Sequence, residues 1–327
     1  MLYNPHWCPP TLTPPFYQTR AGMFALATLC CLLWGSAFPA VKNGYAALGV
    51  GQGDTGSQIL FAGYRFVIAG SVLLGAALVT RRPVLSLTRR RFGEVALLGL
   101  VQTTVQYVFF YVGLAHATGV KSSIMNATGV FFSVALAHVV YADDRLNRGR
   151  ALGCLIGFLG VVVVNLGGSG KLDFEFSLLG EGFIVIAAFI LAAGSMYGKR
   201  LSRDMDAMVM TGWQLFMGGA LLTIGGFAAG GRLVGFDLRA DGLLLYLGLL
   251  SAVAFGLWSL LLKHHPVGLI AAFNFLVPVL GVTLSAVFLG ESLARWSYLA
   301  ALLLVSVGIL LVTRPARAKR IESPPQP

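Results

Sequence analysis

The sequence AGYRFVIAG at residues 62–70 returns in related form as TGWQLFMGG at residues 211–219. Corresponding positions of the two stretches are 149 residues apart, and both stretches have glycine at their second and last positions. The same spacing relates further pairs: Leu98-Gly99-Leu100 to Leu247-Gly248-Leu249, Gly119 to Gly268, and Val130 to Val279. Single matches of such common residues mean little, but a constant spacing across several segments indicates an internal duplication.

The composition of the chain requires lipid as its solvent. Of the 327 residues, 57% are hydrophobic and only 11% are charged, whereas a soluble domain has about 25% charged residues. Such a chain is predicted to be an integral membrane protein. Its net charge of +11 does not indicate nucleic-acid binding, because the basic residues lie in short runs between apolar stretches, where they set membrane topology.

Apolar runs long enough to cross a bilayer recur along the whole chain. Each has about 17 to 24 residues, which at a rise of about 1.5 Å per residue crosses a hydrocarbon core of about 30 Å. We expect an all-α polytopic membrane protein with about ten transmembrane helices. The predicted spans are 23–41, 59–79, 93–115, 119–140, 150–166, 178–198, 207–229, 242–262, 267–289 and 296–313.

The basic residues give this bundle an orientation. Most of the 24 Lys and Arg residues lie on the same side of the predicted bundle as the N-terminal tail, including five arginines between residues 81 and 91. By the positive-inside rule, both termini are expected in the cytoplasm and the chain in the cell (inner) membrane.

Two five-helix repeats are predicted, over residues 23–166 and 178–313. Five is an odd number, so the second repeat must enter the membrane in the opposite orientation. The charges agree, because the loop that corresponds to the five-arginine loop has two Arg residues balanced by two Asp residues. Inverted-topology repeats of this kind are a recurrent feature of secondary transporters.

The two ends of the chain are expected to be tails. Residues 1–22 contain five prolines and are predicted to be a disordered N-terminal tail, with Met23 as an alternative translation start. Residues 314–327 are predicted to form a basic cytoplasmic tail.

The sequence resembles the EamA-type transporters of the drug/metabolite transporter (DMT) superfamily. The resemblance rests on LWGSAFPAVK at residues 33–42 and on NFLVPV at residues 274–279, which leads to LGESL at residues 289–293. The first half has a weaker copy, ATGV at 127–130 and DDRL at 143–146, in which glycine stands for the family's usual proline and acidic residues replace its Gly-Glu pair.

This resemblance covers nearly the whole chain after residue 22. It implies ten helices in two inverted halves, with the first four helices of each half around a central cavity and the fifth packed outside. It also implies transport of small metabolites, often export of amino acids or related compounds, without ATP hydrolysis by the chain itself.

Arg65 is the most informative single residue, because a charge within a membrane span is costly unless it is paired or hydrated. It lies about six residues, or about 9 Å, inside the predicted span 59–79. Either it faces a cavity and attracts an anionic group of the solute, or its side chain reaches the outer interface or a loop acid. Its repeat mate is Gln214, so a cavity lined by both would be asymmetric in charge.

Amide side chains mark other faces of the predicted helices. Gln102 and Gln106 are four residues apart and share one helix face, while Asn126 and Asn274 lie within two further spans. Amide groups in lipid would be unsatisfied, so they must face protein or a wet cavity. Hydrogen bonding between helices and cavity lining are both open for these residues and for Gln214.

Prolines and tryptophans complete the candidate site. Pro39 and Pro278 each remove a backbone donor from an apolar helix and are expected to break or kink it. Trp34 and Trp258 fit either the aromatic walls of a solute site or an interfacial belt and packing role.

No catalytic site, metal site or cofactor is predicted, because no span carries a mid-span carboxylate and no metal-hydrolase, nucleotide-binding or serine-hydrolase motif is present. The expected function is a secondary transporter, and more specifically an exporter, of small metabolites such as amino acids or related carboxylate-bearing compounds, working by alternating access. The alternative is a membrane-embedded enzyme acting on lipid or polyprenyl carriers, for which Asp143-Asp144 is the candidate pair. The expected partners are a small-molecule solute and the lipid bilayer. The small-residue face of Gly153, Gly157 and Gly160 suits either close helix packing within the chain or a homodimer contact.

Overall fold

The computed structural model describes residues 14–51, 53–117, 119–142, 144–169, 176–289 and 296–314, and every regular element in these ranges is a helix. Each of the ten predicted spans has a helical counterpart. Within these ranges, six helices are long and apolar enough to cross a membrane, and shorter apolar helices lie in three more of the spans. The protein is therefore a multi-pass, all-helical membrane protein.

Some spans are single helices and others are stacked helical segments. The helices are α1 (Arg20–Ala47), α2 (Thr55–Val79), α3 (Arg89–Leu98), η2 (Gly99–Val105), α4 (Gln106–His116), α5 (Gly119–Val140), α6 (Arg148–Ser169), η3 (Leu178–Gly182), α7 (Phe183–Ser202), α8 (Ala207–Ala228), α9 (Leu238–His264), α10 (Val267–Ala271), η4 (Ala272–Phe275), α11 (Leu276–Leu289) and α12 (Trp296–Thr313). Of these, η2 and η3 are π-helical turns and η4 is a 3-10 turn.

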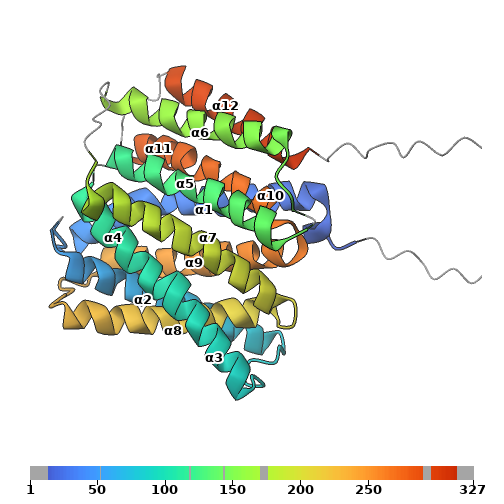
Figure 1. The fold of residues 1–327 in the computed structure, drawn as a ribbon. Coiled ribbons are helices and arrows are strands. Elements are labelled where there is room, and N and C mark those ends of the chain that lie inside the picture. The colour runs from blue at the N-terminus through green and yellow to red at the C-terminus, as the bar shows by residue number, and fades with distance from the viewer. Residues whose placement is uncertain are drawn as a thin grey trace, which may run out of the picture.

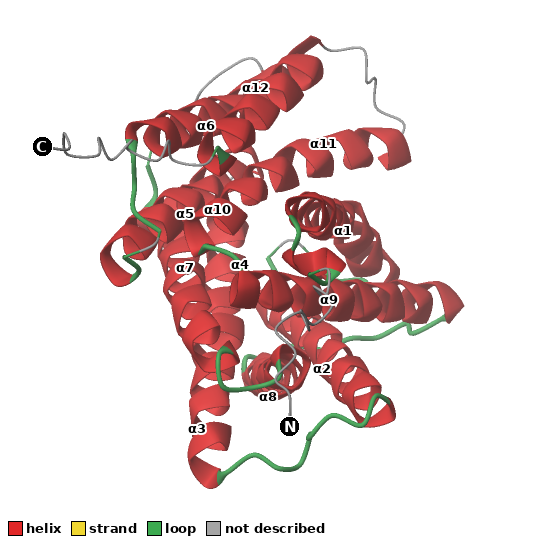
Figure 2. Cartoon of the chain, turned by 90° about the vertical axis from the view of Figure 1, so that its right-hand side faces the viewer, coloured by secondary structure: helices red, strands yellow, loops and turns green. Residues whose placement is uncertain are grey.

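The helices run side by side through the bundle (Figure 1). The second helices of the two halves, α2 and α8, pack against each other along their length. The fifth helices of the halves, α6 and α12, form another pair at the opposite edge of the bundle (Figures 1 and 2).

The contact between α2 and α8 shows that the two halves are related by a two-fold axis. A methyl group on Gly70 would lie 2.4 Å from the backbone nitrogen of Phe216, and one on Gly219 would lie 2.6 Å from the backbone nitrogen of Val67. Gly70 and Gly219 are 149 positions apart, and so are Val67 and Phe216. Each contact is thus the image of the other, which is the relation that an inverted repeat requires.

The beginning of the first helix differs from the sequence-based expectation. Residues 14–22 were predicted to belong to a tail, but α1 begins at Arg20 and is preceded by a 3-10 turn, Phe16–Gln18. The cause is a helix-capping signal after the last proline of the segment: the Thr19 hydroxyl accepts a hydrogen bond from the Gly22 backbone nitrogen at 3.0 Å. Residues 1–13 lie outside the described residues.

The two ends of the described chain lie together. The Arg20 guanidinium donates a hydrogen bond to the Thr313 carbonyl, 3.0 Å away, which joins the start of α1 to the end of α12. Both ends are therefore on one side of the bundle, as an even number of spans requires. Residues 315–327 of the predicted C-terminal tail lie outside the described residues.

The glycine face of α6 is occupied within the molecule. A methyl group on Gly153 would lie 2.7 Å from the Gly308 carbonyl oxygen of α12, and one on Gly157 would lie 2.5 Å from the Phe275 ring. Because α12 and η4 cover this face, its glycines serve close helix packing within the chain, and a homodimer stays a prediction.

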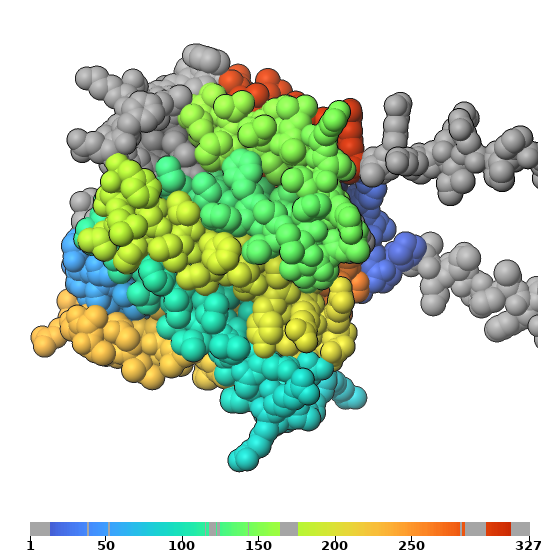
Figure 3. All heavy atoms as spheres, viewed as in Figure 1, coloured from blue at the N-terminus to red at the C-terminus, as the bar shows by residue number. Residues whose placement is uncertain are grey.

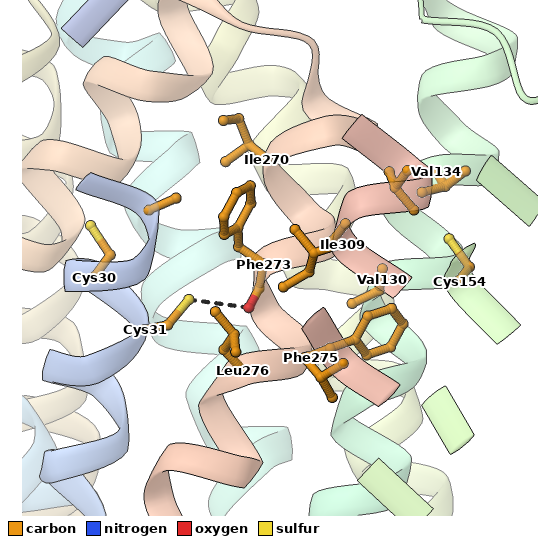
Figure 4. Packing of buried hydrophobic residues seen from close by; sticks show 14 of the residues in the cluster. Cys30, Cys31, Val130, Val134, Cys154, Ile270, Phe273, Phe275, Leu276 and Ile309 are labelled. Carbon is orange, nitrogen blue, oxygen red and sulfur yellow. Dashed lines mark hydrogen bonds between the residues drawn. The ribbon is translucent and has the colours of Figure 1, made fainter. Parts of the chain in front are cut away.

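Buried side chains of α1 and α5 pack against those of α6 and α9–α12 in one large apolar cluster. Figure 4 shows its centre, where the Cys31 thiol donates a hydrogen bond to the Phe273 carbonyl at 3.2 Å. Cys30 and Cys154 are also buried free thiols. These three cysteines act as small packing groups in the core.

Candidate solute-binding site

Arg65 lies inside the bundle, near the middle of α2. Arg65 is ten residues, or about 15 Å, from the start of α2 at Thr55. Only 6% of its surface is exposed. The Arg65 Nε donates a hydrogen bond of 2.7 Å to the Ser251 hydroxyl of α9, which in turn donates to the Leu247 carbonyl at 2.7 Å. The guanidinium therefore does not reach the outer interface.

Aromatic side chains surround this guanidinium. Its centre lies 5.3 Å from the Phe66 ring, and Tyr45, Tyr107 and Tyr111 are close enough to interact with its charge. In the described ranges, none of the ion pairs involves Arg65. A buried positive charge that is held by hydroxyl and aromatic groups, without a carboxylate, is suited to binding an anionic group.

A second polar group forms where η2 meets α8. The Gln214 amide nitrogen donates to the Gln102 amide oxygen and to the Thr103 hydroxyl, both at 3.4 Å. The Gln102 amide nitrogen donates to the Ser195 hydroxyl of α7, also at 3.4 Å. All three distances exceed the usual 2.9–3.0 Å, so these hydrogen bonds are weak and readily exchanged for others.

The π-helical turn η2 and nearby glycines bring this second group together. A methyl group on Gly194 of α7 would lie 2.9 Å from the Gln102 side chain, and one on Gly218 of α8 would lie 2.4 Å from the Thr103 side chain. Such π turns within α-helices are frequent at functional sites. The sequence did not predict this turn, because the apolar run and the i, i+4 spacing of Gln102 and Gln106 both fit an ordinary α-helix.

The two polar groups are images of each other under the repeat. Arg65 and Gln214 are 149 positions apart, and Gln102 and Ser251 are also 149 positions apart. The Arg65–Ser251 contact and the Gln214–Gln102 contact are therefore equivalent, each joining the second helix of one half to the third helix of the other. One is charged and the other is neutral, so the centre of the bundle is asymmetric in charge.

Ser251, Thr103 and Ser195 are the members of these groups that the sequence analysis missed. A signal for Ser251 was present, because it is the repeat mate of Gln102. Ser195 also had one, because the Gly-Ser pair at residues 194–195 repeats the pair at residues 35–36. Thr103 had no comparable signal, since hydroxyl side chains are common in membrane helices.

The two candidate tryptophans lie together. The rings of Trp34 and Trp258 meet edge-to-face at 4.9 Å, and Trp34 also meets Phe255 at 5.4 Å. Phe255 contacts Phe66 beside Arg65 at 6.0 Å. Trp34 is the fifteenth of the 28 residues of α1, so these rings form an aromatic wall inside the bundle that ends at Arg65.

The remaining candidate amides are not part of either polar group. Gln106 is buried, and its amide oxygen has no hydrogen-bond partner among the described residues. Asn126 and Asn274 are half-buried, and no hydrogen bond within the described ranges joins them to Arg65 or Gln214.

The two prolines have different effects. α1 continues as one helix through Pro39, from Arg20 to Ala47, so the expected helix break does not occur there. The 3-10 turn η4, Ala272–Phe275, immediately precedes the helix that contains Pro278. Pro278 lacks the N–H group that would bond to the Asn274 carbonyl, which accounts for the change of helix type.

The described residues contain no group of three His, Cys, Asp or Glu side chains that could hold a metal ion. An open hollow lies beside the loop between α2 and α3, and its lining contains none of Arg65, Gln102, Gln214 and Ser251. Arg65, Gln214 and Ser251 are buried within the bundle, with Gln214 only 4% exposed and Ser251 fully buried, whereas Gln102 is half-buried.

Two inverted five-helix halves with equivalent buried polar contacts are an arrangement that recurs in secondary transporters. The EamA-like transporter family matches residues 22–166 and 178–314, and this chain belongs to that family. A relative in Salmonella typhimurium, named "Probable amino-acid metabolite efflux pump", is 27% identical over 90% of this chain and 96% of its own length.

Further comparisons agree. A protein of Escherichia coli with the same name is 25% identical and covers 86% of this chain and 91% of its own length. An uncharacterized transporter of Bacillus subtilis is 27% identical, and the match covers 93% of this chain and 94% of the relative's length. A solved crystal structure that is 20% identical covers 90% of this chain with a TM-score of 0.76, which shows the shared fold alone.

Proposed function

We propose that this protein is a secondary transporter that exports amino acids or related carboxylate-bearing metabolites. The observation that carries the proposal is Arg65, a charge near the middle of a span, without a described carboxylate partner, at the end of an aromatic wall. A solute carboxylate would supply the missing counter-charge in a site of low dielectric. The names of the two efflux-pump relatives support the same class of solute.

The mechanism we propose is alternating access. Arg65 and Gln214 are both buried, so a solute reaches them only when helices move apart on one side of the membrane. Because each of the two equivalent contacts joins one half to the other, exchanging the conformations of the halves exchanges the two contacts and opens the other side without a new set of interactions. The excess of basic residues on the side of the chain ends supports cytoplasmic termini in an inner membrane.

The acidic pair of the enzymatic alternative does not favour catalysis. Asp143 lies outside the described residues. Asp144 is 1% exposed; it accepts hydrogen bonds from Arg150 at 2.6 Å and from the Gly268 backbone nitrogen at 2.8 Å. This carboxylate thus binds the start of α10 and forms an ion pair with Arg150, which is a structural role.

The experiment is a transport assay with purified protein in proteoliposomes. Vesicles loaded with single radiolabelled amino acids or organic acids are diluted into unlabelled medium, and release is compared with protein-free vesicles. Release of at least one carboxylate-bearing compound is expected to be faster than from protein-free vesicles. Absence of movement across a broad panel, with the protein shown to be inserted and folded, would contradict the proposal.

A further inference from the structure

The loop between α2 and α3 and the start of α3 project from the edge of the bundle (Figures 1 and 3). Beside this loop the described residues leave an open hollow of about 310 Å³. It is lined by Val84, Leu85, Leu87, Arg89, Phe92 and Trp213. The hollow lies on the side of the bundle where α2 ends, which is also the side of the two described chain ends.

The walls of this hollow are apolar and fixed in place. The Trp213 indole nitrogen donates a hydrogen bond to the Val84 carbonyl at 3.1 Å, which ties the loop to α8. The Phe92 ring meets the Trp213 ring at 5.6 Å, and Leu85 remains 84% exposed at the rim. An exposed apolar hollow at the end of membrane helices is suited to a hydrocarbon chain.

The charges of residues 81–91 are unbalanced, and of the basic residues in this segment Arg89 lines the hollow itself. Arg82 pairs with Asp206, and Arg91 pairs with Asp204 and Glu94. Arg81 and Arg89, which belong to the same segment, are exposed and have no ion pair within the described ranges. The local acids are thus already engaged, and two guanidinium groups are free to bind an anion.

The backbone at Arg81 gives an independent observation. Arg81 has a φ of 56°, a left-handed conformation that glycine normally adopts at the end of a helix. Its repeat mate, 149 positions later, is Gly230 with a φ of 79°. Both residues end their helices alike, with Arg81 N bonding to the Leu78 carbonyl and Gly230 N to the Phe227 carbonyl. The first half thus has an arginine where the backbone favours glycine, which indicates a role for its side chain.

We propose that this hollow binds an anionic phospholipid of the adjacent membrane leaflet. Arg81 and Arg89 contact the phosphate, and the apolar walls at Leu85, Phe92 and Trp213 hold the first part of an acyl chain. Basic pockets near the membrane surface suit anionic lipid headgroups. A guanidinium group can donate two parallel hydrogen bonds to two oxygens of one phosphate. The site is separate from the proposed solute site and does not depend on it.

The test uses Trp213 as the probe, in nanodiscs that contain lipids with brominated acyl chains. Brominated phosphatidylglycerol and brominated phosphatidylcholine are compared, and the difference between the wild type and Trp213→Phe isolates the quenching of Trp213. Phosphatidylglycerol should quench at the lower mole fraction. Arg81→Gln and Arg89→Gln should each reduce this preference about fivefold, since one basic residue near a membrane surface contributes about that factor.

The matched control is Arg232→Gln with Arg239→Gln, which removes two exposed arginines at the opposite end of the bundle, one in the loop between α8 and α9 and one in the first turn of α9, and should leave the preference unchanged. Leu85→Gln, which keeps every charge, should weaken quenching by both lipids. Equal quenching by the two lipids, or an unchanged preference in the arginine variants, would overturn the proposal. Displacement by millimolar inorganic phosphate would overturn it too, because the site would then bind free phosphate rather than lipid.

Discussion

At the scale of the residue, the charge of Arg65 is the property that the proposed function depends on. Replacing Arg65 with Gln keeps a hydrogen-bond donor for Ser251 and makes this contact resemble its image at Gln214. Transport of carboxylate-bearing solutes is expected to fall at least tenfold in kcat/KM, because a hydrogen bond to a charged group contributes about 1.5–3 kcal/mol.

The measurement is initial-rate counterflow in proteoliposomes, and Arg232→Gln, which removes an exposed arginine, serves as the control. If the Arg65 variant transports with wild-type kinetics, Arg65 is not in the site.

Ser251 holds Arg65 in position, so its hydroxyl should matter for stability. Ser251→Ala leaves the buried Nε of Arg65 without its 2.7 Å partner. An unsatisfied buried donor costs about 1–3 kcal/mol, and we expect a loss of this size in the free energy of unfolding in detergent. Ser86→Ala, in the exposed loop before α3, should have no such effect. Equal stabilities of the two variants would show that the contact contributes nothing.

At the scale of the element, the α2–α8 pair depends on glycines that admit a neighbouring backbone. In Gly70→Ala the new methyl group would lie 2.4 Å from the Phe216 nitrogen, so α2 and α8 must separate. Gly75→Ala, five residues later in the same helix, meets nothing within 4 Å. It should be neutral or stabilising by up to about 1 kcal/mol, because alanine favours a helix.

Thermal unfolding of the two purified variants decides the point. We expect Gly70→Ala to be less stable by about 1–3 kcal/mol, the usual cost of overpacking, or to fail to accumulate. A Gly70→Ala protein as stable as Gly75→Ala would mean that the helices are not in such close contact.

The elements themselves were largely predictable, because a bilayer demands long apolar segments and the sequence shows them directly. The change from α-helix to π-helix or 3-10 helix within a span could not be predicted from the sequence. The π turn η2 depends on which side chains and glycines of α7 and α8 face Gln102 and Thr103, and no local pattern reports that contact. The use of the α6 glycines against α12 instead of a second copy is also a matter of tertiary packing.

At the scale of the whole molecule, the repeat predicted the relation of Arg65 to Gln214, but not the helix that each contacts. A spacing within the sequence identifies equivalent residues, whereas partners such as Ser251 follow from how the halves interlock. The same limit applies to Trp34 and Trp258, whose edge-to-face contact joins segments that are more than 200 positions apart.

The two-fold relation between the halves predicts that the guanidinium group of the solute site can stand at position 65 or at the equivalent position 214. In the double variant Arg65→Gln, Gln214→Arg, the guanidinium moves to the equivalent position in the other half. There Gln102, the repeat mate of Ser251, offers an amide oxygen as acceptor. If the halves are equivalent around the solute, the double variant should recover part of the carboxylate binding that Arg65→Gln loses.

The measurement is thermal stabilisation of each purified variant by a transported carboxylate, with its uncharged amide analogue as the control. We expect stabilisation in the wild type and the double variant, and little in Arg65→Gln. A correctly inserted double variant that binds no better than Arg65→Gln would show that the repeat relates the helices but not the chemistry between them. In that case the surroundings of Arg65 that have no repeat counterpart, such as the Tyr107 ring where the second half has Gly256, would define the anion site.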